Sequence, residues 1–287
     1  MFKDNSYRSV LNYFQDKLKN LYSEREIRIF CEWSVQSKFN LTKADLLVGE
    51  KRFSESELLW FRSVVKQLKD EKPIQYILGE TVFMGETFEV NSDVLIPRPE
   101  TEELIHLMLS KNLSGSLLDI GTGSGIIPII LKLRNPELQV VGLDVSKEAL
   151  QVAQRNAARH DLSIKWVQSN ILKDEWKELG RFHTIVSNPP YVLKREQAEM
   201  SKNVLAYEPE IALFVEDTSP FIFYERIIFL AQELLYPKGQ LFFEIHEKYG
   251  NVIREILHQH QFIQVEIVKD LQGKDRMISA QKNLSYQ

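Results

Sequence analysis

The 287-residue sequence contains a single cysteine, Cys31, so it cannot form an intramolecular disulfide. This cysteine content is typical of the reducing cytoplasm, and Cys31 is best interpreted as a small buried side chain on a helix. Long apolar runs are also lacking, because the most apolar stretch, residues 126–131, is too short for a membrane span and contains Pro128. The N-terminal ten residues have no apolar core of a signal peptide. We therefore expect a cytoplasmic protein without a membrane segment, and a monomer.

The sequence has no excess of positive charge. Residues 1–80 hold 14 basic and 12 acidic residues, a net charge of +2, and the remainder holds 22 and 28, a net charge of −6. Proteins that grip a nucleic-acid backbone are usually basic, so we expect no direct contact with nucleic acid. We also expect no metal site, since His258 and His260 are two residues apart on a helix and point to different faces.

Apolar residues recur at helical spacing in three segments of the N-terminal part. The stripes are Val10, Leu11, Phe14, Leu18 and Leu21; Ile27, Phe30, Cys31, Ser34 and Val35; and Leu58, Phe61, Val65 and Leu68. Capping boxes are expected at two helix starts, where Ser23 is followed by Glu26 and Ser54 by Glu57. The pattern predicts a small helical bundle over residues 1–73.

A different pattern begins near Pro73. Short alternating runs at residues 81–83 and 87–90, around Gly79 and Gly85, predict a β-hairpin linker over residues 74–98. Pro99 then suits the first turn of a helix, and the acidic residues that follow it suit the positive end of the helix dipole.

Strands and helices alternate from residue 116 onward. This pattern predicts a doubly wound, Rossmann-like α/β domain over residues 99–287, with a seven-stranded, mostly parallel sheet. The expected strands are residues 116–120, 139–143, 163–167, 182–187, 239–245, 262–268 and 275–281.

A glycine-rich turn follows the first of these strands. Its residues are Gly121, Thr122, Gly123, Ser124 and Gly125, and Ile126 occupies the position where dinucleotide oxidoreductases need another glycine. Asp119, just before the turn, would repel a diphosphate but attract a cation. S-adenosylmethionine carries a sulfonium and an ammonium group, so the turn is predicted to bind S-adenosylmethionine rather than NAD.

Two further strand ends offer contacts to a nucleoside. Asp144 is placed to accept hydrogen bonds from both ribose hydroxyls, although a carboxylate there also suits the helix that starts near Ser146. Asn170, which we place at the end of the third strand, is expected to meet the adenine edge, with Ile171 packed on the ring. A loop-capping role for Asn170 is an equal alternative.

The segment Asn188-Pro189-Pro190-Tyr191 follows the fourth strand, beside the first strand at the predicted reversal of strand order. An amide nitrogen is a poor nucleophile, since its lone pair is delocalised into the carbonyl. The side-chain oxygen of Asn188 and the backbone carbonyl of Pro189 could accept its two N–H bonds and orient that lone pair. Tyr191 offers a flat face to a planar group. The segment therefore predicts methyl transfer to an amide or aromatic amine nitrogen, with no general base required.

Several motifs together resemble the bacterial release factor glutamine methyltransferases, the HemK/PrmC family, over nearly the whole chain. The matching segments are residues 96–104, 119–125, 187–191, 207–213 and 270–276, together with Asp144. The resemblance implies that S-adenosylmethionine methylates the glutamine of the Gly-Gly-Gln loop in class I peptide chain release factors. The products would be N5-methylglutamine and S-adenosylhomocysteine, and the helical domain would help to grip the release factor.

The sequence departs from the family pattern at two positions. The family often has glycine where this chain has His246, which we expect to be solvent-exposed near the rim of the site. It often has aspartate where this chain has Asn170. Arg98 could meet the cofactor carboxylate or a substrate carbonyl, or could equally pair with Glu100 or Glu102. The segment from Tyr207 is expected to form a wall of the substrate site.

Three other functions compete with this interpretation. A DNA adenine or RNA base N-methyltransferase would use Asn188 on a flipped base, but the acidic α/β part argues against it. A nucleotide-binding oxidoreductase is disfavoured by Ile126 and by the Asn-Pro-Pro-Tyr segment. The third alternative is a non-enzymatic protein that binds release factors. It predicts that replacing Asn188 with alanine leaves the function in cells intact.

Overall fold

The computed structural model describes residues 2–39, 41, 44–45, 51–173 and 179–284. The chain divides into two compact units. One comprises Met1–Thr81 and Ser201–Tyr207, and the other comprises Val82–Met200 and Glu208–Gln287. Within the described ranges, no helix is both long and apolar enough to cross a bilayer.

The first unit is built from helices, as the three apolar stripes predict. The helices in its described residues include α1 (Tyr7–Leu18), α2 (Glu24–Phe39), α4 (Glu55–Lys69), α5 (Ile74–Leu78) and α9 (Lys202–Tyr207). Phe14, Ile27, Cys31 and Phe61 are among the buried side chains that form its core. The interpretation of Cys31 as a small buried side chain is thus confirmed.

Both expected capping boxes are present. The backbone N–H of Ser23 donates to Glu26 Oε2 at 2.8 Å, and the N–H of Glu26 donates to Ser23 Oγ at 3.3 Å. The Ser54 and Glu57 pair makes the same two contacts at 2.6 and 3.3 Å. These reciprocal bonds satisfy amide protons that have no partner within the helix, and so they fix where α2 and α4 begin.

Residues 74–78 form a helix rather than part of a hairpin linker. Pro73 precedes this single turn, and Gly79 ends it with a φ of 78°, where its N–H donates to the carbonyl of Gln75 at 2.8 Å. Proline and glycine are frequent in turns, and the sequence therefore predicted a linker here. Proline before a segment and glycine after it also delimit a short helix. The hairpin follows as predicted, with β1 (Glu80–Phe83) paired to β2 (Glu86–Glu89).

A seven-stranded sheet organises the second unit and confirms the predicted Rossmann-like class. Its order is β10-β11-β9-β6-β3-β4-β5, in which β9, β6, β3, β4 and β5 are parallel and β11 pairs antiparallel with both neighbours. The strands are β3 (Ser116–Ile120), β4 (Gln139–Asp144), β5 (Lys165–Gln168), β6 (Phe182–Ser187), β9 (Leu235–Glu244), β10 (Phe262–Lys269) and β11 (Asp275–Lys282). The chain order reverses between β3 and β6, the position where open α/β sheets bind ligands.

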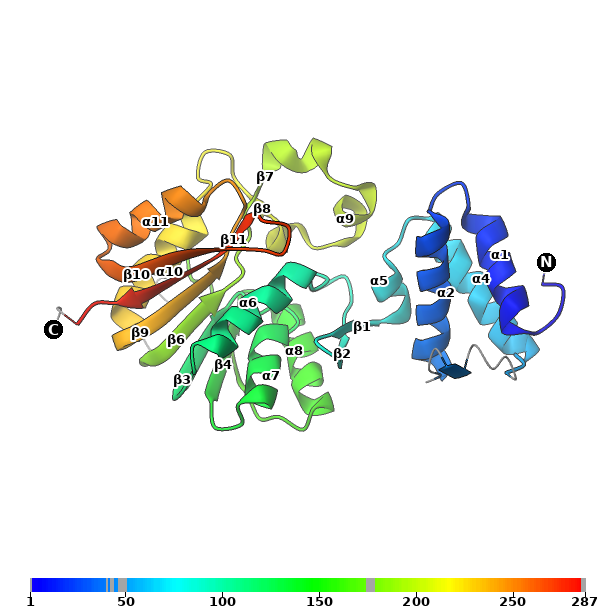
Figure 1. Ribbon diagram of the computed structural model, residues 1–287, viewed down its shortest axis with the longest axis horizontal. Helices are drawn as coiled ribbons and strands as arrows, with labels where there is room; N and C mark the ends of the chain where they lie inside the picture. The colour runs from blue at the N-terminus through cyan, green and yellow to red at the C-terminus, as the bar shows by residue number, and fades with distance from the viewer. Residues whose placement is uncertain (1, 40, 42–43, 46–50, 174–178, 285–287) are drawn as a thin grey trace. The chain divides into compact units, whose positions relative to one another are not determined.

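Helices cover both faces of this sheet (Figure 1). One layer contains α6 (Pro99–Ser110), α7 (Ile126–Arg134) and α8 (Lys147–Arg159), and the other contains α10 (Ile222–Leu234) and α11 (Gly250–Gln259). Neighbouring strand residues serve opposite layers: Leu117 packs in the core with α6 and α7, whereas Leu118 packs in the core with α10. Burial on both faces explains why these strands are almost continuously apolar.

Five strands have boundaries that differ from the prediction by one to four residues, and two of these differences affect the interpretation. The strand β9 begins at Leu235, four residues before the expected start, because the exposed residues 236–238 resemble a turn in sequence. The strand β5 ends at Gln168, so Asn170 lies in the following loop and not at the strand end. Between β6 and α10 the chain forms short elements that the sequence analysis did not assign: β7 (Val192–Leu193), η1 (Lys194–Glu199), η2 (Glu210–Ala212) and β8 (Phe214–Val215), besides α9.

Candidate active site

A cavity of about 360 Å³ opens at the carboxyl ends of β3, β4, β5 and β6. Its walls include most residues that the sequence analysis assigned to the cofactor and the acceptor. These are Gly121, Thr122, Gly123, Ser124, Asp144, Asn170, Ile171, Asn188, Pro189 and Pro190. The topology thus brings together segments that lie far apart in the sequence, because parallel strands present their carboxyl ends at one edge of the sheet.

The glycine turn lies open toward this cavity. Gly121 and Gly123 have φ values of 74° and 53°, and a Cβ added to either would meet no atom within 4 Å. This empty space beside left-handed backbone allows a ligand to approach the main chain closely. Gly125 differs, since a Cβ there would lie 2.9 Å from Ala153 and Trp166. Gly125 therefore allows the turn to pack on α8 and does not line the cavity.

Asn156 holds the turn from the side of α8, although no sequence motif drew attention to it. Its side chain is fully buried, and Nδ2 donates to the carbonyls of Ser124 at 2.9 Å and Glu89 at 3.0 Å. Its Oδ1 accepts from the N–H of Glu89 at 2.6 Å. One asparagine thus fixes the glycine turn to the end of β2.

Asp144 ends β4, as predicted, and also supports the turn. Its Oδ2 accepts from the N–H of Gly123 at 2.8 Å and its Oδ1 from the N–H of Ser146 at 2.9 Å. Burial raises the pKa of this carboxyl, and the backbone N–H groups oppose the rise. Each oxygen keeps a second lone pair for a hydroxyl in the cavity. The predicted contact to a ribose is therefore sterically open, and it stays a prediction.

Replacing Asp144 with alanine is expected to weaken S-adenosylmethionine binding about 10–100-fold, because hydrogen bonds to a carboxylate are worth roughly 1.5–3 kcal/mol each. Isothermal titration calorimetry measures the change directly. Glu148→Ala is a matched control, since Glu148 is an exposed carboxylate in the first turn of α8 and does not line the cavity. Equal dissociation constants for the two variants would contradict the ribose assignment.

Asp119 lies within β3 just below the turn, with no solvent exposure. Among the described residues, neither of its carboxylate oxygens has a hydrogen-bond partner. Burial raises its pKa to about 7; the nearby Thr122 hydroxyl opposes this and the charge of Asp144 adds to it. An unpartnered buried carboxylate of this kind is expensive to ionise unless a positive charge faces it. It therefore suits the cationic cofactor that the sequence predicts.

Asn170 and Ile171 both line the cavity, beside the exposed side chain of Leu172. The side chain of Asn170 also caps its own loop, because Oδ1 accepts from the N–H of Leu172 at 3.0 Å. The capping alternative is thus present, and a contact from Asn170 to adenine stays a prediction. Ile171 is 8% exposed and packs against the core below β5.

The Asn-Pro-Pro-Tyr segment leaves β6 beside the glycine turn. Ser187 Oγ donates to the carbonyl of Ile120 at 2.7 Å and so ties the end of β6 to the end of β3. Asn188 Nδ2 contacts Thr101 Oγ1 at 3.4 Å, and in the described part of the chain Asn188 Oδ1 has no hydrogen-bond partner. Thr101 itself is buried near the start of α6.

Glu244 stands at the centre of the contacts behind Asn188. It ends β9, is 1% exposed, and accepts from Thr101 Oγ1 at 2.7 Å and from the Tyr191 hydroxyl at 3.4 Å. Burial raises the pKa of the Tyr191 hydroxyl well above its ordinary value. Tyr191 does not line the main cavity. It lines a second hollow of about 40 Å³, and Asn188 and Pro189 line both this hollow and the main cavity.

Arg98 pairs with neither Glu100 nor Glu102. Its guanidinium contacts Glu208 Oε1 at 2.6 Å, while Glu208 Oε2 accepts from the N–H of Ile96 at 3.1 Å. Glu208 is buried and belongs to the segment that was expected to form a substrate wall. The sequence marked both segments but could not pair them, since 110 residues separate Arg98 from Glu208.

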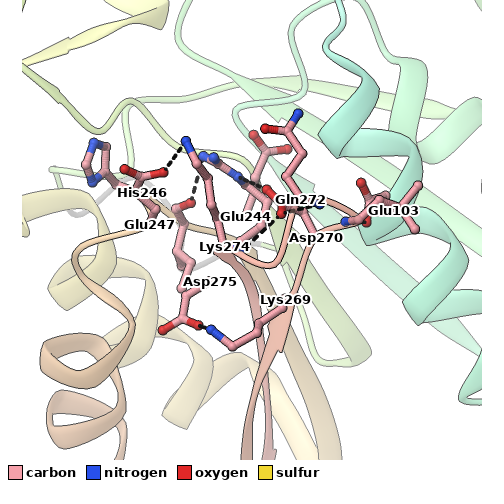
Figure 2. Close-up of polar contacts among 12 residues, drawn as sticks. Glu103, Glu244, His246, Glu247, Lys269, Asp270, Gln272, Lys274 and Asp275 are labelled. Atoms are coloured by element: carbon pink, nitrogen blue, oxygen red, sulfur yellow. Dashed lines mark hydrogen bonds and ion pairs between the residues drawn. The ribbon is translucent and has the colours of Figure 1, made fainter.

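His246 is half-buried rather than solvent-exposed. Its ring centroid lies 6.0 Å from that of Tyr191 and 4.8 Å from that of Tyr249, and burial lowers its pKa. Figure 2 shows His246 near Glu247 and the turn between β10 and β11. His246 therefore supports the Tyr191 ring at the edge of the site. The described residues contain no cluster of histidine, cysteine or carboxylate side chains suited to a metal ion.

The sequence profile of the Methyltransferase small domain matches residues 98–210, and that of the PrmC N-terminal domain matches residues 9–79. A release factor glutamine methyltransferase from Flavobacterium psychrophilum is 43% identical over 273 residues, which are 92% of this chain and 95% of that protein. One from Bacteroides thetaiotaomicron is 37% identical, covering 95% and 99%. The crystal structure of a methyltransferase from Pyrococcus furiosus has a TM-score of 0.52 at 21% identity, covering 70% of this chain and 91% of that one, and so shares the fold.

Proposed function

Because this chain belongs to the family of release factor glutamine methyltransferases, we propose that it methylates the side-chain amide nitrogen of the glutamine in the Gly-Gly-Gln loop of class I peptide chain release factors. S-adenosylmethionine is the methyl donor, and the products are N5-methylglutamine and S-adenosylhomocysteine. The position of Asn188 is the observation that best supports this proposal, because Asn188 lines both the donor cavity and a small second hollow.

The main cavity supplies the donor site. The open backbone at Gly121 and Gly123 receives the cofactor, and Asp144 accepts from its ribose hydroxyls. Asn170 and Ile171 meet its adenine, while the uncompensated charge of Asp119 favours its cationic groups. When bound there, S-adenosylmethionine supplies an electrophilic methyl group on a sulfonium.

The small hollow suits a side-chain amide better than a nucleobase. The hollow has a volume of about 40 Å³, far smaller than the main cavity of about 360 Å³, so it suits a small planar group such as a carboxamide. Its walls include Asn188, Pro189, Pro190, Tyr191 and Arg98. A purine ring would need these walls to move apart, and the net charge of −6 beyond residue 80 gives a nucleic-acid backbone little attraction.

Two acceptors activate the glutamine nitrogen. Asn188 Oδ1 and the carbonyl of Pro189 take its two N–H bonds, hold the nitrogen in place and stabilise the positive charge that develops there. The nitrogen gains the methyl group as the sulfonium sulfur takes back its bonding electron pair. The methylated amide then loses one proton to water, so no side chain has to act as a base.

We assign the release factor contact to residues 1–73 together with α5, the linker to the hairpin segment 79–98 and catalysis to residues 99–287. The helical unit has a core of its own, so it can serve as a separate binding module. The buried, unoxidised Cys31 and the acidic α/β part agree with a cytoplasmic monomer that binds no nucleic acid.

Methyl transfer from labelled S-adenosylmethionine tests the function. We expect label in an intact class I release factor and none in a release factor whose Gly-Gly-Gln glutamine is replaced by alanine. Total RNA and unmethylated DNA serve as competing acceptors in the same assay. Label confined to nucleic acid would refute the proposal, and label in both release factors would place the acceptor at another residue.

A further inference from the structure

The orientation of the Asn188 amide decides whether it can activate an acceptor nitrogen. An asparagine side chain presents an oxygen at one end and an NH₂ group at the other. If the amide were rotated by half a turn, its NH₂ would face the N–H bonds of the substrate, and two donors would meet. Under the proposed function, the protein must therefore fix which end of this amide faces the acceptor.

The contacts behind Asn188 impose one direction. The carboxylate of Glu244 can only accept, so the Thr101 hydroxyl must point its single proton at Glu244 Oε2, 2.7 Å away. The Thr101 oxygen is then left as an acceptor for its other neighbour. That neighbour is Asn188 Nδ2 at 3.4 Å, which turns Oδ1 away from Thr101.

We propose that Thr101 and Glu244 are positioning residues that act through Asn188, by fixing its amide so that Oδ1 faces the acceptor nitrogen. This inference rests on the proposed function. Thr101 borders the main cavity and Glu244 borders the small hollow, but both act here through the Asn188 amide. The inference gives a reason why a threonine and a glutamate lie buried together behind Asn188. Tyr191 joins the same carboxylate through Oε1, so Glu244 also orients the tyrosine that ends the motif.

Arg276 supplies the positive charge nearest to this group. It lies on β11, contacts the carbonyl of Ile245 at 3.5 Å, and is held through its Nε by Asp270 Oδ2 at 3.4 Å. Figure 2 shows Glu244 beside the turn that carries Asp270, Gln272 and Lys274. Asp270 Oδ1 accepts from the N–H groups of Gln272 and Lys274, both at 2.9 Å. These two hydrogen bonds stabilise the turn between β10 and β11.

The protonation of Glu244 should control this arrangement. Burial raises its pKa to about 7, while the Thr101 hydroxyl, Arg276 and Tyr191 favour the ionised form and Glu100 opposes it. Tyr224 on α10 also faces Glu244, where its hydroxyl donates to the backbone carbonyl. A protonated Glu244 can donate to Thr101, which removes the reason for Asn188 Nδ2 to point there. Turnover at saturating cofactor should therefore fall as the pH drops through about 7.

A pair of variants at Thr101 separates orientation from packing. Thr101→Val keeps the shape and removes the hydroxyl, whereas Thr101→Ser keeps the hydroxyl. We expect Thr101→Val to lower kcat by about 10–100-fold, less than loss of the acceptor itself. KM for the release factor and Kd for S-adenosylmethionine should change less than threefold, and Thr101→Ser should restore most of kcat. Equal kcat for the two folded variants would overturn the proposal.

The glutamate is tested by the pH profile. Glu244→Gln offers an NH₂ that can donate to Thr101, so we expect a low kcat without the inflection near pH 7 that the unaltered chain shows. Asp119 also has a pKa of about 7, so the profile is measured in an Asp119→Asn background at saturating cofactor. An inflection that persists when Glu244→Gln is added to that background would overturn the role of this carboxylate.

A measurement without substrate keeps this test independent of the proposed function. The side-chain NH₂ of Asn188, identified by NMR from its loss in Asn188→Asp, should exchange with solvent faster in Thr101→Val than in Thr101→Ser. Equal exchange in both would refute the orientation. An unaltered chain that labels no release factor would instead refute the proposed function alone.

Discussion

Replacing Asn188 with alanine is expected to slow methylation of the release factor by about 10²–10³-fold, the usual loss when one hydrogen-bonding group that stabilises a transition state is removed. Asn188 lies at the junction of the two hollows with Oδ1 directed away from Thr101. The alanine variant loses that acceptor, so the glutamine amide is neither oriented nor stabilised as positive charge develops. Single-turnover kinetics with labelled S-adenosylmethionine measure the loss in the chemical step.

Cofactor binding provides the internal control for this variant. The glycine turn and Asp144 do not depend on Asn188 for their contacts, so the Kd for S-adenosylmethionine should change little. Asn188→Asp gives a second comparison, because it keeps an oxygen but sets an acceptor against the Thr101 oxygen. We expect that variant to be impaired as well. Unchanged turnover in Asn188→Ala would exclude the role assigned to Asn188.

Replacing Asp119 with asparagine is expected to stabilise the cofactor-free protein and to weaken the cofactor complex. The carboxyl is fully buried, and its pKa is raised from 3.8 to about 7. Because the pKa of Asp119 is higher in the folded protein than in the unfolded chain, binding of its proton stabilises the fold. This stabilisation is fully present below the pKa of the unfolded chain, near 4, and is lost as the pH rises through about 7. At pH 8 the ionised, unpartnered group therefore destabilises the fold, on the order of 2–4 kcal/mol.

The neutral amide of Asp119→Asn removes that penalty. Its melting temperature without cofactor should exceed that of the unaltered chain at pH 8, and the difference should vanish near pH 4. Its affinity for S-adenosylmethionine should fall about 10-fold, because the attraction between the buried carboxylate and the cationic cofactor is lost. Asp144→Asn is the contrasting variant: its carboxylate accepts backbone N–H groups, so the change should destabilise the protein. A loss of stability in Asp119→Asn at pH 8 would contradict the electrostatic argument.

Local patterns in the sequence were enough to predict which segments line the main cavity. The glycine turn, Asp144 and the Asn-Pro-Pro-Tyr segment each lie at or directly after the end of a strand, and the sheet topology brings them to one edge. Their chemistry depends on neighbouring backbone, so a short stretch of sequence carries the information. The capping boxes at Ser23 and Ser54 could be predicted for the same reason.

Side-chain pairs between distant segments could not be predicted in this way. Arg98 was expected to meet the cofactor carboxylate, a substrate carbonyl or a nearby glutamate, but it pairs with Glu208, and no role was predicted for Glu244. Nothing in a single sequence records which carboxylate a buried hydroxyl will face. The short helix at Ile74 was missed for another reason, because proline and glycine mark both turns and helix ends.

The long sequence separation of the acceptor-side contacts has a consequence for how the enzyme is made. Gly123 and Asp144 are 21 residues apart, whereas Thr101 and Asn188 are 87 apart and Thr101 and Glu244 are 143 apart. Contacts that close such large loops form late, after the intervening chain has folded. On a translating ribosome, the nucleoside-binding turn can close while the support behind Asn188 is still unsynthesised. A chain that stops before Glu244 would carry the whole Asn-Pro-Pro-Tyr motif and lack the carboxylate that orients it.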